Sequence, residues 1–195
     1  MTTITIPAPY VGAIMQFPAL KSVKRCNNCV YLESTGDSAF MVATDGSILG
    51  AFRLEFPPAS SFKAIIPRQA FLGVKFGHRA DDVAVTITDT DATVSQGQFV
   101  KTEKLVPLDY PDWRRVIPHS VSGEAGYYDA GLVARIGRAA EVLHGKGRTW
   151  KAHIEQNGKE SVALVGLNNP SFVGAIMPMR ARPAVVPKWV NGSYN

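Results

Sequence analysis

The clearest chemical motif in the sequence is the pair Cys26 and Cys29, separated by two residues. This C-x-x-C spacing occurs in redox pairs and in half of a four-ligand zinc site. There is no second C-x-x-C and no histidine at zinc-finger spacing after it. Two structural or surface thiols are therefore the favoured interpretation, and we expect neither a metal nor a cofactor.

Other residue types that perform catalysis are present but scattered. The four histidines, at positions 78, 119, 144 and 153, show no H-E-x-x-H or similar spacing. Nucleophile-elbow, Walker and dinucleotide-binding glycine motifs are absent from the sequence. Asp89 and Asp91 are typical of a turn rather than a catalytic pair. Nothing supplies a nucleophile, a base and an oxyanion site together, so we predict that the protein is not an enzyme.

The composition is that of an ordinary globular protein of one or two domains. The chain has 195 residues, of which 46% are hydrophobic and 19% charged. Two cysteines fit a reducing cytoplasm, and no secretory signal or membrane span is expected, because no apolar run approaches about 20 residues. The net charge of +5 is a modest excess, so the position of the basic residues decides what they bind.

Hydrophobic periodicity predicts a structural unit of strands and a helix that occurs three times along the chain. Amphipathic helices are expected at 17–25, 67–79 and 129–143, each followed by short strands of alternating polarity. The strands are expected at 30–32, 39–42, 48–54, 83–87, 92–94, 99–106, 150–154, 162–165 and 172–177. Leading strands are expected at 10–14, at 64–66 and before 129. The pattern indicates an α+β fold of repeated β-α-β-β-β units with antiparallel sheet on one side and helices on the other.

Basic residues gather on the expected helices, where acidic residues are missing. No carboxylate occurs at 15–26, 56–80 or 130–140. A charged helix face is commonly just solvated, but solvated faces usually mix both signs. Three acid-poor helices indicate a shared anionic partner such as double-stranded DNA. The residues expected to meet phosphates are Lys21, Lys24, Arg25, Arg68, Lys75, Arg79, Arg135, Arg138, Lys146 and Arg148.

Four short motifs, in order along the chain, resemble the bacterial β sliding clamp family, the processivity subunit of DNA polymerase III. Residues 43–49, A-T-D-G-S-I-L, are similar to its A-T-D-G-H-R-L, and 65–70 to its I-P-R-K-A helix start. Residues 110–118, Y-P-D-W-R-R-V-I-P, resemble F/Y-P-D-Y-R-R-V-L-P, and 177–180 match the terminal M-P-M-R. The resemblance implies the same repeated unit, with helices facing a central channel and sheets outside.

The resemblance also implies an apolar groove that binds short peptides from polymerases, the clamp loader and repair proteins. The matching positions are Thr44, Gly46, Leu49, Pro111, Arg115, Val116, Met177, Pro178, Met179 and Arg180. Ser47 and Ile48 replace the family's His-Arg, which puts binding of the usual client peptides in doubt. Without the family, the segment from Met177 to Met179 would be interpreted as a plain final strand with core methionines.

The family chain has six units and this chain three, which predicts a complete clamp domain at 1–118, a half-domain at 119–180 and a tail at 181–195. A closed ring of twelve units would need four copies, so a tetrameric ring is favoured, with a crescent-shaped dimer as the alternative. The tail either docks on a neighbour or in the groove through Val185, Val186 and Trp189, or stays solvated.

These observations predict a non-enzymatic clamp that encircles duplex DNA and tethers replication or repair proteins through the groove. A first alternative is a regulator or decoy that binds a full-length clamp or its loader without encircling DNA. A second is a small nucleic-acid-processing enzyme that uses Cys26, Cys29 and nearby carboxylates.

Overall fold

The computed structural model describes residues 1–20, 25–77, 79–145, 147, 152–181, 184–187 and 190. A first unit contains strand β1 (Thr2–Ile6), helix α1 (Ala8–Ile14), the 3-10 turn η1 (Arg25–Asn28) and strands β2 (Cys29–Thr35), β3 (Ala39–Thr44) and β4 (Ile48–Leu54). A second contains β5 (Ser61–Pro67), η2 (Arg68–Phe71), β6 (Val83–Ile87), β7 (Asp91–Gln96) and β8 (Phe99–Lys104). After η3 (Trp113–Val116), the third contains α2 (Ala130–His144), β9 (His153–Glu155), β10 (Ala163–Gly166) and β11 (Phe172–Ile176).

The first two units exchange their leading strands. β1 pairs with β6 of the second unit, and β5 pairs with β2 of the first. The result is a four-stranded sheet in the order β1-β6-β7-β8 and a seven-stranded sheet in the order β5-β2-β3-β4-β11-β10-β9. All of these pairs are antiparallel. Each sheet needs a strand from the other unit, so the first two units must fold together.

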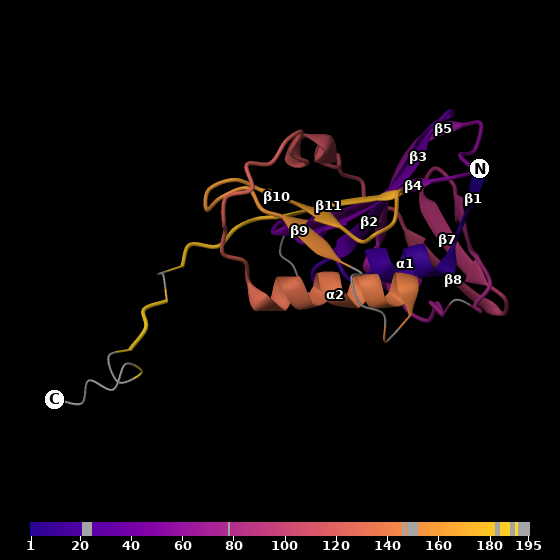
Figure 1. Cartoon of the computed structure of the whole chain (residues 1–195). Helices are drawn as coiled ribbons and strands as arrows, with labels where there is room; N and C mark the ends of the chain where they lie inside the picture. Colours follow the sequence, from indigo (N-terminus) through magenta and orange to yellow (C-terminus); the bar gives the residue numbers. More distant parts are fainter. Residues whose placement is uncertain are drawn as a thin grey trace.

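The third unit joins the first through the edges of their last strands. β11 pairs antiparallel with β4, from Phe172 opposite Phe52 to Ile176 opposite Ile48. Below the joined strands, α1 and α2 pack side by side, while the segment containing η3 crosses the opposite face (Figure 1). The third unit has no leading strand among the described residues before α2. The described strands of the seven-stranded sheet therefore end at β9.

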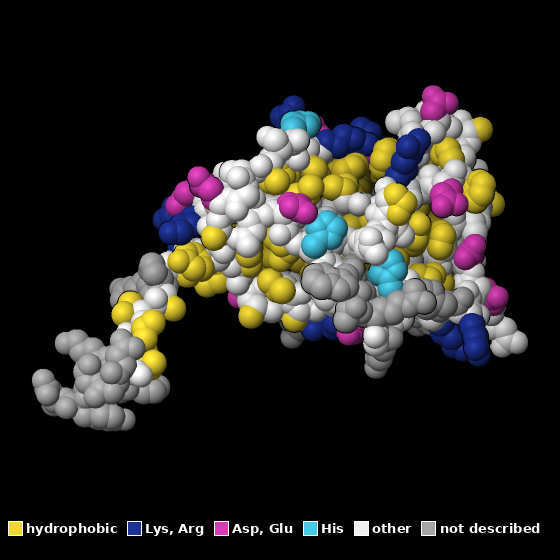
Figure 2. Space-filling model, in the orientation of Figure 1, with side chains coloured by type: hydrophobic (Ala, Val, Ile, Leu, Met, Phe, Trp, Pro, Cys, Tyr) yellow, Lys and Arg dark blue, Asp and Glu magenta, His cyan; other side chains and the backbone are white. Residues whose placement is uncertain are grey.

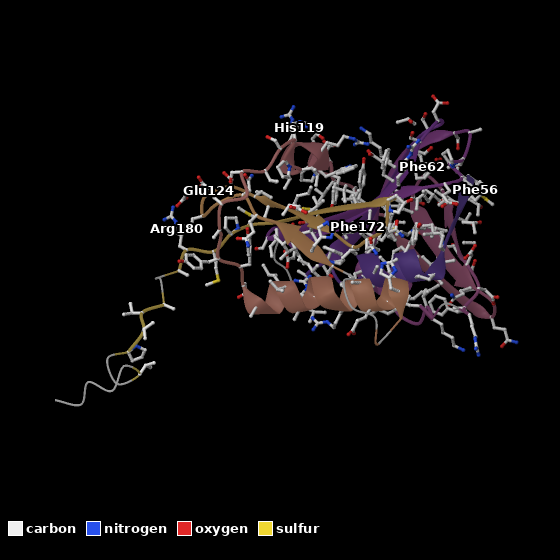
Figure 3. All side chains as sticks on the ribbon, viewed as in Figure 1. Phe56, Phe62, His119, Glu124, Phe172 and Arg180 are labelled. Atoms are coloured by element: carbon white, nitrogen blue, oxygen red, sulfur yellow. The ribbon has the colours of Figure 1, made fainter. Side chains whose placement is uncertain are left out.

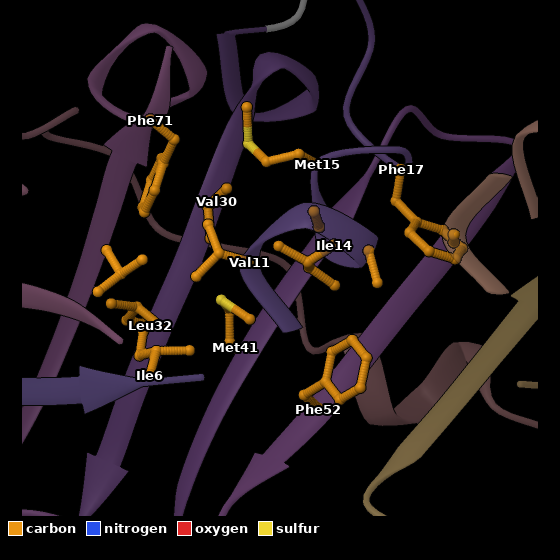
Figure 4. Packing of buried hydrophobic residues seen from close by; sticks show 14 of the residues in the cluster. Ile6, Val11, Ile14, Met15, Phe17, Val30, Leu32, Met41, Phe52 and Phe71 are labelled. Atoms are coloured by element: carbon orange, nitrogen blue, oxygen red, sulfur yellow. The ribbon is translucent and has the colours of Figure 1, made fainter. Parts of the chain in front are cut away.

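The main core lies between the sheets and the two helices. Val11, Ile14 and Met15 point from α1 and its end toward Val30 and Met41 on the strands (Figure 4). Burial of such apolar side chains contributes about 25 cal/mol per Å² of surface removed from water. A second, smaller cluster lies on the other face, where Tyr31, Val42 and Leu49 are covered by Trp113. The central strands β2 to β4 are therefore buried on both faces.

The expected helix at 129–143 is confirmed as α2, whose first turn is capped by Asp129 accepting a hydrogen bond from Leu132 N–H at 3.0 Å. The other two expected helices are wrong in place or length. For the first, the helix lies instead at Ala8–Ile14, where a strand was expected. In the stretch 17–25, the described residues before Arg25 form bends and irregular backbone. The second is reduced to η2, because β5 continues to Pro67 and Gly73 has a φ of 120°, which a helix does not accept.

Strand positions follow the sequence pattern more closely. β4 and β6 have the expected bounds, and eight further strands overlap expected ones, although Trp150 and Lys151 lie outside the described residues. β1 was not expected, and no strand occurs directly before α2 among the described residues. None of the described helices has the length and apolarity needed to cross a lipid bilayer. The expected α+β fold of antiparallel sheets is confirmed.

Candidate functional site

A groove of about 440 Å³ opens on the outer face of the seven-stranded sheet, where β4 meets β11. Its floor comes from the start of β4 and the end of β11, and one wall comes from the segment around η3. Most of its lining is apolar, with Leu49, Val116, Val162 and Met177 among the side chains. Such a shape suits apolar side chains presented by a partner, with few polar groups to fix their orientation.

Seven of the ten expected peptide-binding residues line this single groove: Thr44, Gly46, Leu49, Pro111, Arg115, Val116 and Met177. They come from three separate parts of the sequence. The other three, Pro178, Met179 and Arg180, follow Met177 but are not part of the lining. Met179 N–H instead donates a hydrogen bond to Tyr127 O at 2.7 Å, and Arg180 lies where the tail leaves the body (Figure 3).

The turn between β3 and β4 forms one rim of the groove and is tightly hydrogen-bonded. One carboxylate oxygen of Asp45 accepts hydrogen bonds from Ser47 N–H at 2.7 Å and Ile48 N–H at 2.9 Å. Gly46 has a φ of 96°, a conformation that favours glycine. Met177 N–H donates to Ser47 O at 2.8 Å, which ties the rim to the end of β11. These hydrogen bonds brace the rim without any contact from a partner.

The wall of the groove is fixed to the sheet by the buried carboxylate of Glu33. This side chain accepts hydrogen bonds from Tyr31 Oη at 2.9 Å and Trp113 Nε1 at 3.3 Å, and Arg114 Nη2 lies 2.6 Å from it. The Arg114 guanidinium also stacks 4.4 Å from the Trp113 ring. A paired and fully hydrogen-bonded buried carboxylate is tolerated, whereas an unpaired one is costly.

Tyr110 completes the attachment of the wall. Its ring stacks on Tyr31 with centroids 4.4 Å apart and an interplanar angle of 4°. Burial raises the pKa of Tyr110, and the nearby Cys26 and Cys29 thiols raise it further. Burial also raises the pKa of Tyr31, followed by its hydrogen bond to Glu33. Both phenols therefore stay neutral in the folded protein.

Half of the lining lies outside the set of residues expected to bind peptide. Tyr110 and Trp113 lie within the quoted Y-P-D-W-R-R-V-I-P motif, so their apolar side chains were available as a signal. Val162 and Ala175 belong to the third unit and reach the groove only because β11 pairs with β4. No local pattern encodes that long-range pairing. The remaining lining residues outside the expected set are Asn27, Ser47 and Ile48, of which Ser47 and Ile48 are expected at the groove as replacements for the family's His-Arg.

A larger hollow of about 750 Å³ lies on the other side of the same wall. Its lining mixes Lys63, Asp89 and Lys104 with apolar residues of β5 and the following segment. None of the residues expected to bind peptide lines it, and it gathers no set of groups with an evident common chemistry. The groove between β4 and β11 is the better candidate for a binding site.

The expected phosphate-binding residues do not form the three helical stripes that the sequence pattern predicted. Lys75 and Arg79 follow η2 in an irregular segment and are exposed, whereas Arg68 is partly buried. Arg138 is exposed on α2. Basic side chains lie mainly along the margins of the face in Figure 2, with apolar side chains between them. Lys21, Lys24, Lys146 and Arg148, with the side chain of Arg25, lie outside the described residues.

Arg135 corrects the expected phosphate contact most clearly. Its guanidinium forms an ion pair with Asp45 and donates to the carbonyl oxygens of Gln16 at 2.7 Å, Phe17 at 2.7 Å and Pro18 at 2.9 Å. Its side chain is only 20% exposed. With four of its five N–H groups occupied, Arg135 holds the structure together and is not an open phosphate site.

The C-x-x-C segment shows no metal-binding geometry. No group of three or more potential metal ligands occurs among the described residues, and both cysteines are thiols. Burial raises the pKa of Cys29 from 9.0 to about 11, with a further contribution from Cys26. A thiol whose pKa is raised in this way is a poor nucleophile near neutral pH.

Comparison with known proteins agrees with the family resemblance of the four sequence motifs. The chain is 29% identical over 104 residues to the β sliding clamp of Pseudomonas aeruginosa, covering 51% of this chain and 28% of that protein. It is 27% identical over 158 residues to the β sliding clamp of Escherichia coli K12, covering 78% of this chain and 41% of that protein. The chain is related to the bacterial β sliding clamps. No family model matches it.

Solved clamp structures share the fold. The DNA polymerase III β subunit of P. aeruginosa superposes with a TM-score of 0.70 at 17% identity, covering 93% of this chain and 67% of that one. The β subunit of Thermotoga maritima gives a TM-score of 0.69 at 12% identity, covering 93% and 66%. A P. aeruginosa DnaN sliding clamp bound to griselimycin gives 0.67 at 18%, covering 92% and 66%. This sliding-clamp relative spans less than half the length of the curated clamps it matches.

Proposed function

We propose that this sliding-clamp relative is a non-enzymatic DNA tether that holds partner proteins through the groove between β4 and β11. The observation that carries the proposal is the convergence of seven motif residues from three parts of the sequence on one apolar groove. The partners would be DNA polymerases, a clamp loader or repair proteins that present short peptide segments. Tethering raises the local concentration of a partner on DNA without any catalytic step.

The lining indicates the kind of peptide. Leu49, Val116 and Met177 offer apolar contact, while the cation of Arg115 stands at the edge with its side chain 85% exposed and 3.1 Å from Asp112. The family's charged residue is replaced by Ile48, whose side chain is only 1% exposed and belongs to the main core, so no cation stands at this position of the groove. We therefore expect a peptide with apolar anchor side chains and little requirement for an acidic group.

Griselimycin is a suitable probe, because a solved P. aeruginosa clamp structure contains it. Calorimetry should show one molecule binding per chain. Val116→Asp and Met177→Asp should each weaken binding about tenfold or more, because a carboxylate on the rim opposes the burial of apolar surface. Both side chains are exposed, at 42% and 49%, so the fold should survive.

Phe56→Asp is the matched control, because Phe56 is 81% exposed and is not part of the groove lining. This variant should bind griselimycin as the wild type does. Absence of binding to the wild-type chain, or equal binding by all four proteins, would count against the groove.

We further propose that the face carrying α1 and α2 is turned toward duplex DNA. Both helices lie on the same side of the seven-stranded sheet (Figure 1), and Arg138 projects from α2 as an exposed cation. Lys75 and Arg79 add exposed positive charge in the second unit. Contacts of this kind are blind to base sequence and weaken as salt displaces the phosphate contacts.

The DNA proposal is tested by measuring the affinity for a short duplex over a range of salt concentrations. Arg138→Glu should weaken binding and lower the slope of log affinity against log salt by about one. Lys63→Glu, an exposed charge reversal on β5, is the control and should change both quantities less. Identical slopes of log affinity against log salt for the wild type and Arg138→Glu would show that α2 does not contact DNA.

The edge at β9 favours a second candidate function, that of a regulator of a full-length clamp. β2 and β6 each receive a leading strand from a companion unit, but β9 pairs only with β10 within the described chain. An edge of this type could accept the leading strand of an opened clamp ring. Co-purification with a full-length clamp, and its loss when Ile154 of β9 is replaced by proline, would support this role.

A further inference from the structure

The tail at residues 181–195 carries an apolar segment that extends away from the body of the molecule. It leaves the sheets after Arg180, and its described part points away from them (Figure 1 and Figure 3). Val185 and Val186 are 83% and 66% exposed, and Val190 is 53% exposed. Apolar side chains follow the described part of the tail in Figure 2. Exposed valines on an extended segment suit recognition by an apolar surface.

The chemistry of the tail matches that of the groove between β4 and β11. The groove lining is mostly apolar, and we expect its ligand to need no acidic group. No aspartate or glutamate occurs from Ser161 to Asn195, so the tail offers its valines without a carboxylate. Pro187 restricts Val186 to extended backbone, which lowers the entropy lost on binding. The tail therefore has the properties of the peptide that the groove is expected to bind.

The groove and the start of the tail lie at the same end of β11. Met177 lines the groove directly after this strand, and the tail departs after Arg180. Val185 and Val186 are not part of the lining of their own chain's groove. An extended chain spans up to about 23 Å between Met179 and Val186. Two copies that face each other at this end can therefore each reach the groove of the other.

We propose that two copies of this chain exchange tails, so that Val185 and Val186 of each copy enter the groove of the other. This inference rests on the proposed function, because it uses the same groove. Each copy gives one tail and one groove, and a two-fold axis relates the two contacts. The tails keep both grooves covered, so a client peptide must displace a tail before it binds. The exchange thus regulates access to the groove.

The two contacts of the exchange reinforce each other. Once one tail is bound, the second tail and groove are held close together, and their contact forms within the same complex. Two weak peptide contacts can therefore hold a dimer that one contact alone would not. A ligand that occupies the grooves removes both contacts, so saturating griselimycin should dissociate the dimer.

A complementation experiment tests the exchange. Sedimentation equilibrium should show the wild type associating to twice its 21.1 kDa chain mass. Val186→Asp in the tail and Val116→Asp in the groove should each weaken the dimer about tenfold or more, because each variant alone loses both contacts. An equimolar mixture of the two variants keeps one intact contact, and should associate more strongly than either variant alone. Ala181→Asp, an exposed change in the same tail before the valines, is the matched control and should keep the wild-type mass.

Each other outcome contradicts the exchange in a different way. A wild type that stays monomeric at all accessible concentrations would overturn it, and tighter griselimycin binding by Val186→Asp in that case would place the tail in the groove of its own chain. A dimer that Val186→Asp leaves unchanged would assign the association to another surface. A mixture no stronger than the single variants would show that tail and groove do not meet across copies. The mass measurements of the variants need no griselimycin, so the exchange and the proposed function can fail separately.

Discussion

Arg135 on α2 forms an ion pair with Asp45 in the turn between β3 and β4, and this contact joins the helical layer to the rim of the groove. Asp45 uses its other carboxylate oxygen to hold the turn through Ser47 and Ile48. Arg135 also binds three carbonyl oxygens in the segment just beyond α1. A single guanidinium thereby fixes three separate segments relative to one another.

Replacing Arg135 by alanine should therefore destabilise the fold, by about 2–4 kcal/mol, because the Asp45 carboxylate and three carbonyl oxygens lose their donor. Arg138→Ala, three residues along the same helix but exposed, should change stability by less than about 0.5 kcal/mol. Urea unfolding measures both values. Equal stability of the two variants would show that the Arg135 network contributes little.

The Glu33 carboxylate determines whether the wall of the groove is preformed. Glu33→Ala removes the acceptor of Tyr31, Trp113 and Arg114 at once and should cost about 2–4 kcal/mol in the free energy of unfolding. It should also weaken griselimycin binding, since the wall residues Pro111 and Val116 are no longer held. Calorimetry on Glu33→Ala and on Glu55→Ala, an exposed control, measures the effect. Unchanged affinity in a destabilised Glu33→Ala would mean that the wall keeps its place without this contact.

Alternation along strands is the part of the fold that the sequence pattern predicts well. β4 and β6 have the expected bounds because the residues of β6 alternate between a buried and a less buried face, and those of β4 are all buried except Arg53. Helix α1 was not predicted, because the periodicity argument requires a helix with one polar face. Five of its seven residues are buried, so Ala8–Ile14 shows no polar face, and the basic stretch after Pro18 resembled an amphipathic helix better.

The groove could be predicted only in part. Its motif residues, such as Thr44 and Pro111, carry a signal in short segments of sequence. The contribution of Ala175 depends on the pairing of β11 with β4, between residues more than a hundred positions apart, which no local pattern specifies. The opposite error occurred at Arg135, where regular spacing suggested an exposed charge. Its partner Asp45 lies far away in the sequence and becomes visible only in three dimensions.

Two glycines in the helices should respond in opposite directions to alanine. A Cβ at Gly12 of α1 would lie 2.6 Å from Val142 Cγ1 of α2 and 2.5 Å from Phe76 Cβ, so Gly12→Ala should separate the helices and cost about 1–3 kcal/mol. A Cβ at Gly137 of α2 would meet no atom within 4 Å, so Gly137→Ala should stabilise the chain by about 1 kcal/mol. Thermal unfolding of Gly12→Ala and Gly137→Ala measures the change in stability of each variant. A loss of stability in Gly137→Ala would mean that α2 needs a small residue at that position.

The free energy of unfolding should fall at alkaline pH, because the buried groups Cys29 and Tyr110 lose protons more readily in the unfolded chain. Burial raises the pKa of Cys29 to about 11 from 9.0, and that of Tyr110 above its ordinary 10.0. The folded state keeps protons that the unfolded state releases, so this contribution is complete below pH 9.0 and is lost as the pH rises toward about 11. The free energy of unfolding should fall across that interval, and less steeply in Cys29→Ala. Partly exposed Cys26 should react with iodoacetamide before Cys29 does. Equal alkylation rates at Cys26 and Cys29, with no fall in the free energy of unfolding above pH 9.0, would contradict this prediction. Such a result would show that water reaches the Cys29 thiol in the folded protein.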